Sequence, residues 1–280
     1  AMNIGLFNFA TDYSMPVPDL AREAEARGFE SFWIPEHTHI PASRRTPWPG
    51  GGDLPREYAH TFDPFTALGA AAAVTSTIKL GTGIVLIIER DTITAAKAAA
   101  SVDHLSGGRF LFGLGGGWNR EEAEHHGTEW DTRFKRLAEQ MQAMKVIWTE
   151  VKAEFHGEHV DFEPIYSWPK PVQQPHPPIL LGGETIHTLR RIVAHGDGWL
   201  PRARDPEQVL EGIPTLRGLA EEAGRDPDTI GVSVFGLSPD PDLVARFTEA
   251  GVERIIFAVP PDEPDATRRR MDRLTGFLPG

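Results

Sequence analysis

The sequence predicts an α/β fold, a (β/α)8 TIM barrel with insertions after strand 2 and before strand 5, as a single domain over residues 1–280. Two observations lead to this fold class. Short apolar segments alternate along the chain with longer amphipathic segments, and strands that alternate with helices form a parallel sheet. The alternation occurs eight times, which is the number of repeats that closes the sheet into a barrel. A doubly wound open sheet of the same elements is the alternative.

The expected strands are the short apolar segments, each followed by a helical stretch. They cover residues 3–9, 31–34, 78–87, 110–114, 177–183, 198–200, 229–235 and 254–259.

The helices between these strands have recognisable ends. Gly28 stands where a helix C′ glycine belongs, and Asp63 with Pro64 supplies an N-cap and a first-turn proline. After the fourth strand, apolar residues recur three and four positions apart, which is typical of a helix face that packs on the core. These residues, which we expect to serve in packing and not in cofactor binding, are Phe134, Leu137, Met141, Met144 and Trp148.

Two long stretches interrupt the alternation, residues 38–61 and residues 151–178. Loops of this length inside a compact domain are usually functional or disordered. The active sites of (β/α)8 barrels lie on the loops after the carboxyl ends of the strands. Glycine, histidine or acidic residues follow the second, third, fourth and fifth strands. We therefore expect the site at these four strand ends.

Three consecutive glycines, Gly115 to Gly117, follow the fourth strand. A dinucleotide-binding fingerprint would need a third spaced glycine, but Trp118 occupies that place here, as Leu86 does after the third strand. A phosphate-binding P-loop is excluded too, because no Gly-Lys-Ser/Thr follows any glycine cluster. Bare backbone at neighbouring strand ends instead allows a flat, wide ligand to approach the main chain closely.

A further glycine pair, Gly182 and Gly183, precedes Glu184 and Thr185 at the start of an amphipathic stretch. The free N–H groups and the dipole at a helix start form an anion site. A planar ring at one strand end and a phosphate at another are typical of a flavin-type cofactor. Each glycine cluster, taken by itself, also fits a tight turn between strand and helix.

The composition is that of an ordinary globular protein, with a formal net charge of −12 and no cysteine. The lack of cysteine excludes disulfides and thiolate metal sites. The acidic balance argues against nucleic acid and anionic membranes as partners, and no apolar run approaches the ~20 residues of a membrane helix. We expect a cytoplasmic protein without a signal peptide, acting on a small molecule.

Five segments occur in a distinctive order: WIPEH, DPFTALGAAAAVTSTIKLGTGIV, RFLFGLGGGWNREE, WPKPVQQPHPPILLGGET and AHGDGWLP. Together they resemble the luciferase-like monooxygenase superfamily from residue 2 to about residue 200, and most of all its branch that uses the deazaflavin coenzyme F420. The resemblance implies a TIM barrel, usually a homodimer, with the cofactor at the carboxyl end of the barrel.

The resemblance also implies roles for individual residues. A cis peptide bond that supports the ring from behind matches Gly83 and Ile84, and an acid–histidine pair matches Glu36 and His37. Sugar-phosphate dehydrogenases of this family carry a glutamate where this chain has Trp118, so a glucose 6-phosphate type of reaction is not expected. The other implied cofactor-binding residues are Gly116, Gly117, Trp118 and Asn119 in the ring and ribityl loop, and Gly182, Gly183, Glu184 and Thr185 in the phosphate turn.

The expected reaction transfers a hydride between F420 and an unidentified small organic substrate, with the cofactor supplying the hard chemistry. His37 is the expected catalytic residue for the accompanying proton, because the unperturbed pKa of histidine lies near neutral pH. Glu36 would orient His37 or form a salt bridge elsewhere, and His37 could instead cap a loop. The alternatives are an FMN-dependent monooxygenase that activates oxygen, and a barrel that carries the cofactor without catalysis.

Four arginines are placed to meet a phosphate or a poly-glutamate tail, although solvated arginines fit the pattern equally well. They are Arg44, Arg45, Arg202 and Arg204.

The insertion at residues 38–61 is expected to select the substrate, with Trp48 and Tyr58 as pocket walls. The same region raises a metal hydrolase as a rival, because His37 and His39 have a spacing that one metal ion could use. The later strands end without further ligands, so no metal is expected.

Overall fold

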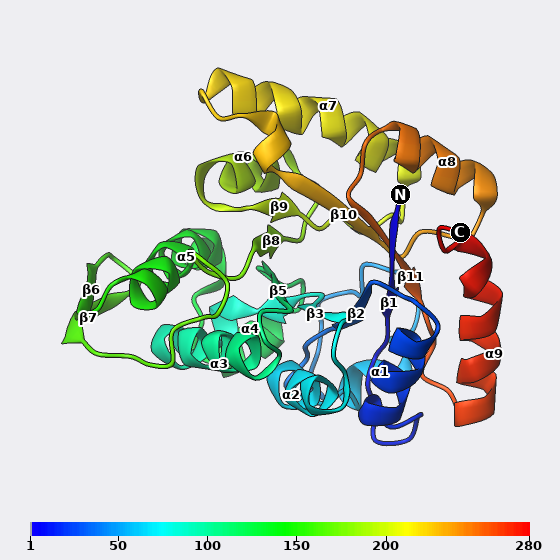
Figure 1. Cartoon of the computed structure of the whole chain (residues 1–280). Helices are drawn as coiled ribbons and strands as arrows, with labels where there is room; N and C mark the ends of the chain where they lie inside the picture. Colours follow the sequence, from blue (N-terminus) through cyan, green and yellow to red (C-terminus); the bar gives the residue numbers. More distant parts are fainter. Residues whose placement is uncertain (1) are drawn as a thin grey trace.

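The computed structural model describes residues 2–280, and its central element is a closed ring of parallel strands (Figure 1). In ring order the strands are β1 (Asn3–Phe7), β2 (Ser31–Ile34), β3 (Lys79–Thr82), β5 (Phe110–Gly115), β8 (Ile179–Leu181), β9 (Gly198–Trp199), β10 (Gly231–Phe235) and β11 (Arg254–Ala258). The ring closes because β1 pairs with both β2 and β11, and β3 pairs with both β2 and β5. The predicted (β/α)8 barrel is confirmed, and the open doubly wound sheet is excluded.

Helices follow the strands and cover the outside of the ring (Figure 1). In chain order they are α1 (Val17–Ala26), α2 (Pro64–Val74), α3 (Thr92–Leu105), α4 (Arg120–His125), α5 (Arg133–Thr149), α6 (Ile186–His195), α7 (Pro206–Glu222), α8 (Pro241–Glu249) and α9 (Pro264–Leu274). Short 3-10 turns are η1 (Arg56–Ala59), η2 (Ile87–Glu89), η3 (Trp130–Thr132), η4 (Pro227–Thr229) and η5 (Thr275–Phe277).

The predicted helix ends are present. The side chain of Asp63 accepts a hydrogen bond from the backbone N–H of Thr66 at the start of α2, with Pro64 in the first turn. Gly28, with φ of +89°, follows the C-cap of α1. The side chain of Asp63 thereby satisfies a backbone N–H group that has no partner within the helix.

The third strand differs from its prediction. Instead of one strand over residues 78–87, the chain forms β3 and then β4 (Val85–Leu86), separated by a cis peptide bond between Gly83 and Ile84. β3 pairs with β2, whereas β4 pairs only with β5. The first strand is also shorter than predicted, and α4 is a separate helix that was not expected.

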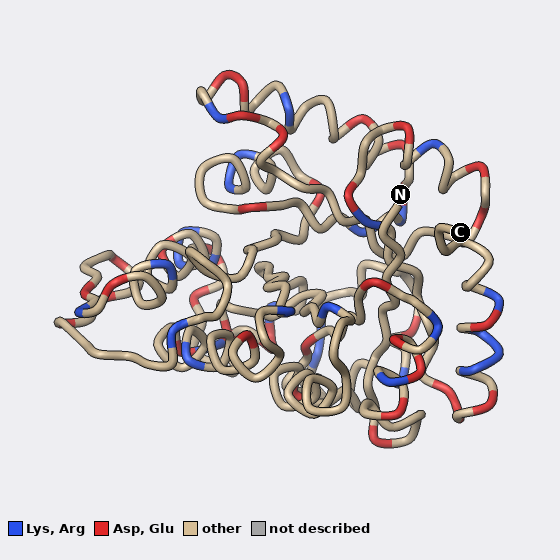
Figure 2. The backbone as a smooth tube through the Cα atoms, in the orientation of Figure 1, with Lys and Arg blue, Asp and Glu red and all other residues tan. Residues whose placement is uncertain are grey.

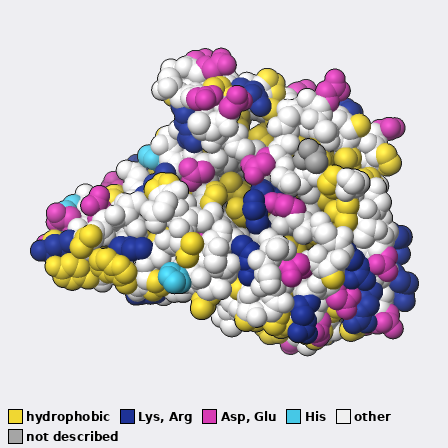
Figure 3. All heavy atoms as spheres, in the orientation of Figure 1, with side chains coloured by type: hydrophobic (Ala, Val, Ile, Leu, Met, Phe, Trp, Pro, Cys, Tyr) yellow, Lys and Arg dark blue, Asp and Glu magenta, His cyan; other side chains and the backbone are white. Residues whose placement is uncertain are grey.

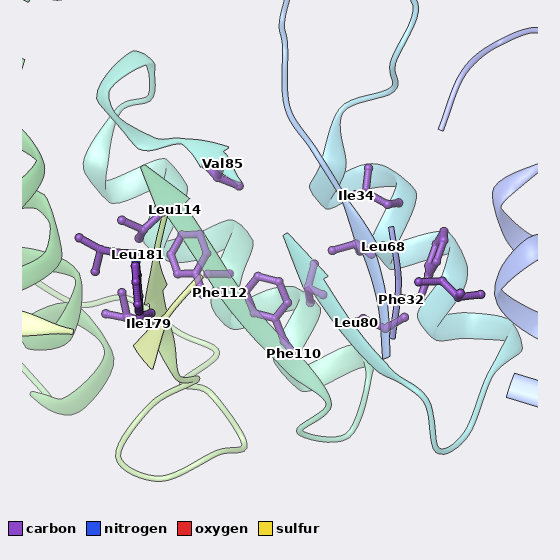
Figure 4. Close-up of a cluster of buried hydrophobic side chains, with 14 of the residues drawn as sticks. Phe32, Ile34, Leu68, Leu80, Val85, Phe110, Phe112, Leu114, Ile179 and Leu181 are labelled. Carbon is purple, nitrogen blue, oxygen red and sulfur yellow. The ribbon is translucent and has the colours of Figure 1, made fainter. Parts of the chain in front are cut away.

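Apolar side chains of the strands alternate between two layers, as the twofold period of a strand requires. Phe110, Phe112 and Leu114 of β5 face the surrounding helices (Figure 4). The intervening Leu111 belongs to a second cluster with Trp33. Gly81 lies against the indole ring of Trp33, and an added Cβ would collide with that indole. The core therefore lies both inside the barrel and between the strands and the helices.

The two insertions have different structures. Residues 38–61 contain only the turn η1. The second insertion forms an antiparallel hairpin of β6 (Ala153–His156) and β7 (Asp161–Ile165), at the end of the molecule that also holds part of α5 (Figure 1). Acidic and basic residues are interspersed along the outer helices (Figure 2). No helix within residues 2–280 combines the length and the apolar character that crossing a bilayer requires.

Candidate functional site

A cavity of about 680 Å³ opens at the carboxyl ends of the barrel strands, a volume typical of a small-molecule or cofactor site. Loops that follow β2, β3, β5 and β8 contribute to its wall, so the four strand ends predicted to form the site do meet. The expected residues that line the cavity are Glu36, His37, Tyr58, Gly83, Ile84, Gly116, Gly117, Trp118, Gly182, Gly183, Glu184, Thr185, Arg202 and Arg204.

Part of the cavity wall is apolar. It is made by Ile84 and Leu86 beside the third strand, by Phe7 of β1 and Phe235 of β10, two strands that both pair with β11, and by Trp118. Phe7 and Phe235 contact each other, with ring centroids 5.6 Å apart. An extended apolar wall of this kind suits the face of a flat ring.

The three glycines at the end of β5 and directly after it are needed for a different reason from the predicted approach of a ligand to bare backbone. An added Cβ on Gly115 would collide with the side chain of Ile84, and one on Gly116 would lie 2.5 Å from the ring of Phe134. Gly117 has φ of +67°, a conformation that side chains disfavour. Neighbouring side chains thus occupy the space above two of the three glycines, and Ile84 and Phe134 form this part of the cavity wall themselves.

His37 is buried at the cavity wall, with its side chain 7% exposed. Its Nδ1 atom lies 2.8 Å from Oε2 of Glu122, and its ring lies 5.1 Å from that of Tyr58. Burial lowers the pKa of His37 to about 4, although the negative charge of Glu36 acts to raise it. Within residues 2–280 the Nε2 atom has no hydrogen-bond partner, so a neutral imidazole offers that atom to a ligand.

Of the two roles expected of Glu36, the structure shows the salt bridge elsewhere. Its carboxylate accepts a hydrogen bond from Nε of Arg90 at 2.8 Å and one from the backbone N–H of Leu86 at 2.7 Å. Burial raises the pKa of Glu36, while Arg90 and the Leu86 N–H oppose that shift. Glu36 therefore holds the segment after β3 in place and does not orient His37.

The residue that does orient His37 is Glu122 in α4. It was not predicted, although it belongs to the segment NREE that follows the glycine loop. Asn119, expected to bind the cofactor, does not line the cavity. Its side chain caps α4 by accepting from the backbone N–H of Glu122 at 3.4 Å. The physical reason is local: an Asn directly before a helix satisfies a free N–H, and here that fixes the start of the helix that carries Glu122.

Another part of the cavity wall is cationic. Thr185 caps α6, and the first turn of this helix faces the cavity beside Gly182 and Gly183. Arg191 lies 4.3 Å from the ring centroid of Phe134, and Arg133 lies 4.2 Å from the same centroid. Phe134 thus supports two cavity arginines, which corrects its assignment to the packing face only.

Two of the four predicted arginines, Arg202 and Arg204, line the cavity, while Arg44 and Arg45 do not. Arg45 instead lies 3.6 Å from a carboxylate oxygen of Glu121. Within the described part of the chain, none of the four cavity arginines forms an ion pair with a carboxylate. They are Arg133, Arg191, Arg202 and Arg204.

The expected substrate walls are only partly as predicted. Tyr58 lines the cavity and Trp48 does not. The indole N–H of Trp48 donates to the hydroxyl of Tyr58 at 3.1 Å, so Trp48 supports Tyr58 from behind.

The two histidines that suggested the metal hydrolase alternative turn to different partners. His37 points to Glu122, whereas His39 stacks on His125 with ring centroids 5.1 Å apart. Over residues 2–280 the structure contains no group of three or more His, Asp or Glu side chains placed to hold a metal ion.

A family model described as luciferase-like monooxygenase matches residues 12–238. The chain belongs to the luciferase-like monooxygenase family. It is 41% identical over 283 residues to an uncharacterized protein of Mycobacterium tuberculosis, with 99% of each chain covered. It is 31% identical to an FMNH2-dependent dimethylsulfone monooxygenase of Pseudomonas putida over 155 residues, which are 54% of this chain and 42% of that enzyme.

The fold of this luciferase-like protein also matches a solved structure closely. The coenzyme F420-dependent tetrahydromethanopterin reductase of Methanopyrus kandleri superposes with a TM-score of 0.75 at 19% identity, over 99% of this chain and 97% of that one. Relatives and structural neighbours of the family thus include enzymes of both cofactor classes. These comparisons support a flavin-type cofactor, F420 or FMN, for barrels of this family.

Proposed function

We propose that this luciferase-like protein is a coenzyme F420-dependent oxidoreductase that transfers a hydride between the deazaflavin and a small organic substrate. The observation that carries the proposal is the pairing, in one cavity, of an apolar wall with four arginines that have no carboxylate partner. The chain as a whole has a net charge of −12, so a local excess of cations indicates an anionic ligand.

The number of arginines favours F420 over FMN. A single phosphate can be bound by the α6 N-terminus with Arg133 and Arg191, both of which line the cavity there. Arg202 and Arg204 remain available for a longer anionic chain, such as the poly-glutamate tail of F420. FMN has no group that would use this second pair.

The residues present fit such a cofactor. Ile84 and Leu86 would support one face of the ring, and Gly183 and Thr185 would hold the phosphate at the start of α6. The bound deazaflavin would supply the hydride chemistry. His37 would then hold or release a proton at Nε2 beside the substrate, in a space bounded by Tyr58. We take small hydroxyl or carbonyl compounds as the substrate class, because their oxygen can exchange a proton with Nε2 while their carbon exchanges the hydride.

The proposal is tested by adding F420 and FMN separately and measuring the melting temperature, since a ligand bound only by the native state raises it. F420 is expected to raise the melting temperature, and Arg202→Ala with Arg204→Ala is expected to reduce this effect while leaving any effect of FMN unchanged. Stabilisation by FMN and none by F420 would favour the monooxygenase alternative. Binding of F420 without turnover of a panel of alcohols and ketones would favour a cofactor-carrying barrel.

The FMN alternative has one specific observation in its favour, the 31% identity to an FMNH2-dependent monooxygenase over about half of this chain. It predicts that reduced FMN bound to the protein consumes oxygen in the presence of an oxidisable substrate. Oxygen uptake with FMNH2 and none with F420H2 is the result that would select it.

We also propose that the protein forms a homodimer. Apolar side chains are exposed on and around the hairpin insertion, where Figure 3 shows hydrophobic atoms gathered at one end of the molecule. They include Val151, 66% exposed, Tyr166, 70% exposed, and Trp168, 48% exposed. Exposed apolar patches of this kind mark association surfaces. Light scattering should give twice the monomer mass for the wild type and a smaller mass for Trp168→Glu, and a monomeric wild type would reject the dimer.

A further inference from the structure

The partner of His37 is itself part of a buried acidic pair. Glu122 in α4 and Glu89 in η2 come from different elements, and their carboxyl groups lie close enough for each to shift the pKa of the other. The side chain of Glu122 is 0% exposed and that of Glu89 is 3% exposed. Two neighbouring carboxyl groups that are both buried resist being ionised together, because like charges repel and burial disfavours the charged form. The pair therefore holds at least one proton out of contact with solvent.

The charged groups around this pair favour that proton. Burial raises the pKa of Glu89, and the charges of Glu122 and Glu36 raise it further, while Arg90 opposes them. Burial likewise raises the pKa of Glu122, and the charge of Glu36 adds to this shift. The backbone N–H of Thr38, 3.2 Å from the carboxylate of Glu122, and the side chain of Glu89 oppose it. Arg90 already binds Glu36 and Asp63, so it does not neutralise the pair.

On its outer side the pair approaches the surface. Oε2 of Glu89 lies 3.8 Å from Nε2 of His126, a separation that one water or a small ring movement can bridge. The hydroxyl of Thr38 lies 2.7 Å from the same Nε2 atom, and the side chain of His126 is 29% exposed. His37, Glu122, Glu89 and His126 thus form a row of titratable groups that runs from the cavity to solvent.

We propose that Glu122 is a positioning residue that exchanges a proton with Nδ1 of His37, and that Glu89 and His126 connect it to solvent. This inference rests on the proposed function, because the proton concerned is the one that accompanies hydride transfer. It adds that the proton reaches the site through the protein and not through the mouth of the cavity, so a bound cofactor does not block it.

The transfer balances in both directions. In reduction of a carbonyl by the reduced deazaflavin, the hydride forms the new C–H bond, the Nε2–H bond of His37 breaks and the substrate O–H bond forms. At the same time the O–H bond of Glu122 breaks and an Nδ1–H bond forms, so His37 stays neutral. Oxidation of an alcohol by the oxidised cofactor reverses each bond change.

The geometry requires the two neutral tautomers of His37 to interchange with the state of Glu122. While Glu122 is protonated, its O–H donates to Nδ1 and the ring proton lies on Nε2, facing the cavity. When Glu122 loses its proton, the carboxylate accepts from Nδ1–H, and Nε2 becomes an acceptor. A purely structural contact would hold one tautomer at every pH.

Nitrogen NMR of histidine-labelled protein, recorded without cofactor, tests this directly. The His37 signals are assigned by their loss in His37→Asn. In the wild type they should change from the Nε2–H to the Nδ1–H pattern as the pH rises through the alkaline range. Glu122→Gln should abolish the change, and Glu89→Leu should move its midpoint to higher pH, because the contact with Glu89 that lowers the pKa of Glu122 is lost. One tautomer throughout the titration of the wild type overturns the proposal, as does an unchanged transition in Glu122→Gln.

A neighbouring carboxylate provides the matched control. Glu121 lies next to Glu122 in the same helix, but its carboxylate accepts from the backbone N–H of Arg45 and from the hydroxyl of Thr46. Glu121→Gln should leave the tautomer change of His37 intact. Circular dichroism and the melting temperature establish that each variant is folded, and Glu122→Asp serves as a second variant, which should retain the change with a shifted midpoint.

The outward connection has its own readout. Exchange of the His37 Nδ1 proton with water, measured above the transition, should be slower in His126→Asn than in the wild type. It should be unchanged in His60→Asn, a histidine that pairs with Asp12 instead. Equal rates in all three proteins would overturn the connection through His126. None of these measurements needs F420, so failure of F420 to bind would reject the proposed function while leaving the proton exchange decided separately.

Discussion

Nδ1 of His37 lies 2.8 Å from Oε2 of Glu122, although the two residues are separated by 85 positions in the sequence. His37 follows β2, and Glu122 lies in the short helix after β5. The barrel brings these strand ends to one mouth, as parallel strands in a closed ring require. Burial favours the neutral form of each side chain, so the pair is suited to moving a proton and not to holding a fixed ion pair.

The first prediction concerns turnover. His37→Asn should lower the rate of hydride transfer by roughly 10²–10⁴-fold, the usual contribution of a general acid–base group, for any substrate that the wild type converts. The absorbance of F420 follows the reaction, and F420 affinity should remain within a few-fold of the wild type. His60→Asn serves as the control outside the cavity. A wild-type rate in His37→Asn would remove His37 from the mechanism.

A second prediction follows from Glu89, whose pKa burial raises to about 9. A carboxyl whose pKa is higher in the folded than in the unfolded state binds its proton more tightly in the fold. Its contribution to stability is therefore complete below the unfolded value and is lost as the pH rises toward 9. One such group changes the free energy of unfolding by at most about 1.4 kcal/mol per pH unit.

Glu89→Gln should consequently flatten the decline of stability between pH 5 and about pH 9, the window set by the two pKa values of this group. Denaturant unfolding at a series of pH values measures the slope for the variant and the wild type. Glu124→Gln offers a matched control, because Glu124 is exposed beside Arg120. Parallel curves for the wild type and Glu89→Gln would mean that Glu89 is ionised in the fold.

The sequence allowed the barrel, the strand ends and most of the cavity lining to be predicted, because each rests on local patterns. The cap at Asp63 and the glycine turn before Thr185 are signals within a few residues. The pairing of His37 with Glu122 is not local, and nothing in the NREE segment distinguishes Glu122 from its neighbour Glu121, which also carries a carboxylate but turns toward Arg45.

Phe134 and Arg191 illustrate the same limit. Phe134 fits an apolar helix stripe, yet it stands at the end of α5 that meets the cavity and carries two guanidinium groups. Arg191 lies within the amphipathic stretch after the glycine pair, where helical spacing alone does not say that it turns toward the cavity. Their roles depend on how α5 and α6 are placed relative to the ring of strands, which periodicity does not contain.

The third prediction concerns the turn before α6. Gly183 has φ of +116°, and an added Cβ would lie 2.6 Å from the hydroxyl oxygen of Thr188. Gly183→Ala should therefore displace the turn and weaken binding of the cofactor phosphate, measured as a higher Kd for F420. Gly69→Ala is the control, since no atom lies within 4 Å of its added Cβ in α2. It should raise stability by about 0.5–1 kcal/mol and leave the Kd unchanged, and equal affinities in both variants would remove the turn from the binding site.

The last prediction concerns the ion pair of Glu36 with Arg90. Arg90→Met keeps much of the side-chain volume but leaves the buried carboxylate of Glu36 without its cation, which costs about 3–5 kcal/mol in comparable buried pairs. Glu36→Gln alone should also destabilise the fold, and the double variant should lose less than the sum of the two, because neither charge then remains unpaired. The surface pair of Asp19 with Arg22 gives the comparison: both side chains are about half exposed, so Arg22→Met should cost no more than about 1 kcal/mol. Urea unfolding of the four variants measures these differences. Additive losses at Glu36 and Arg90 would show that the two side chains stabilise the segment after β3 independently.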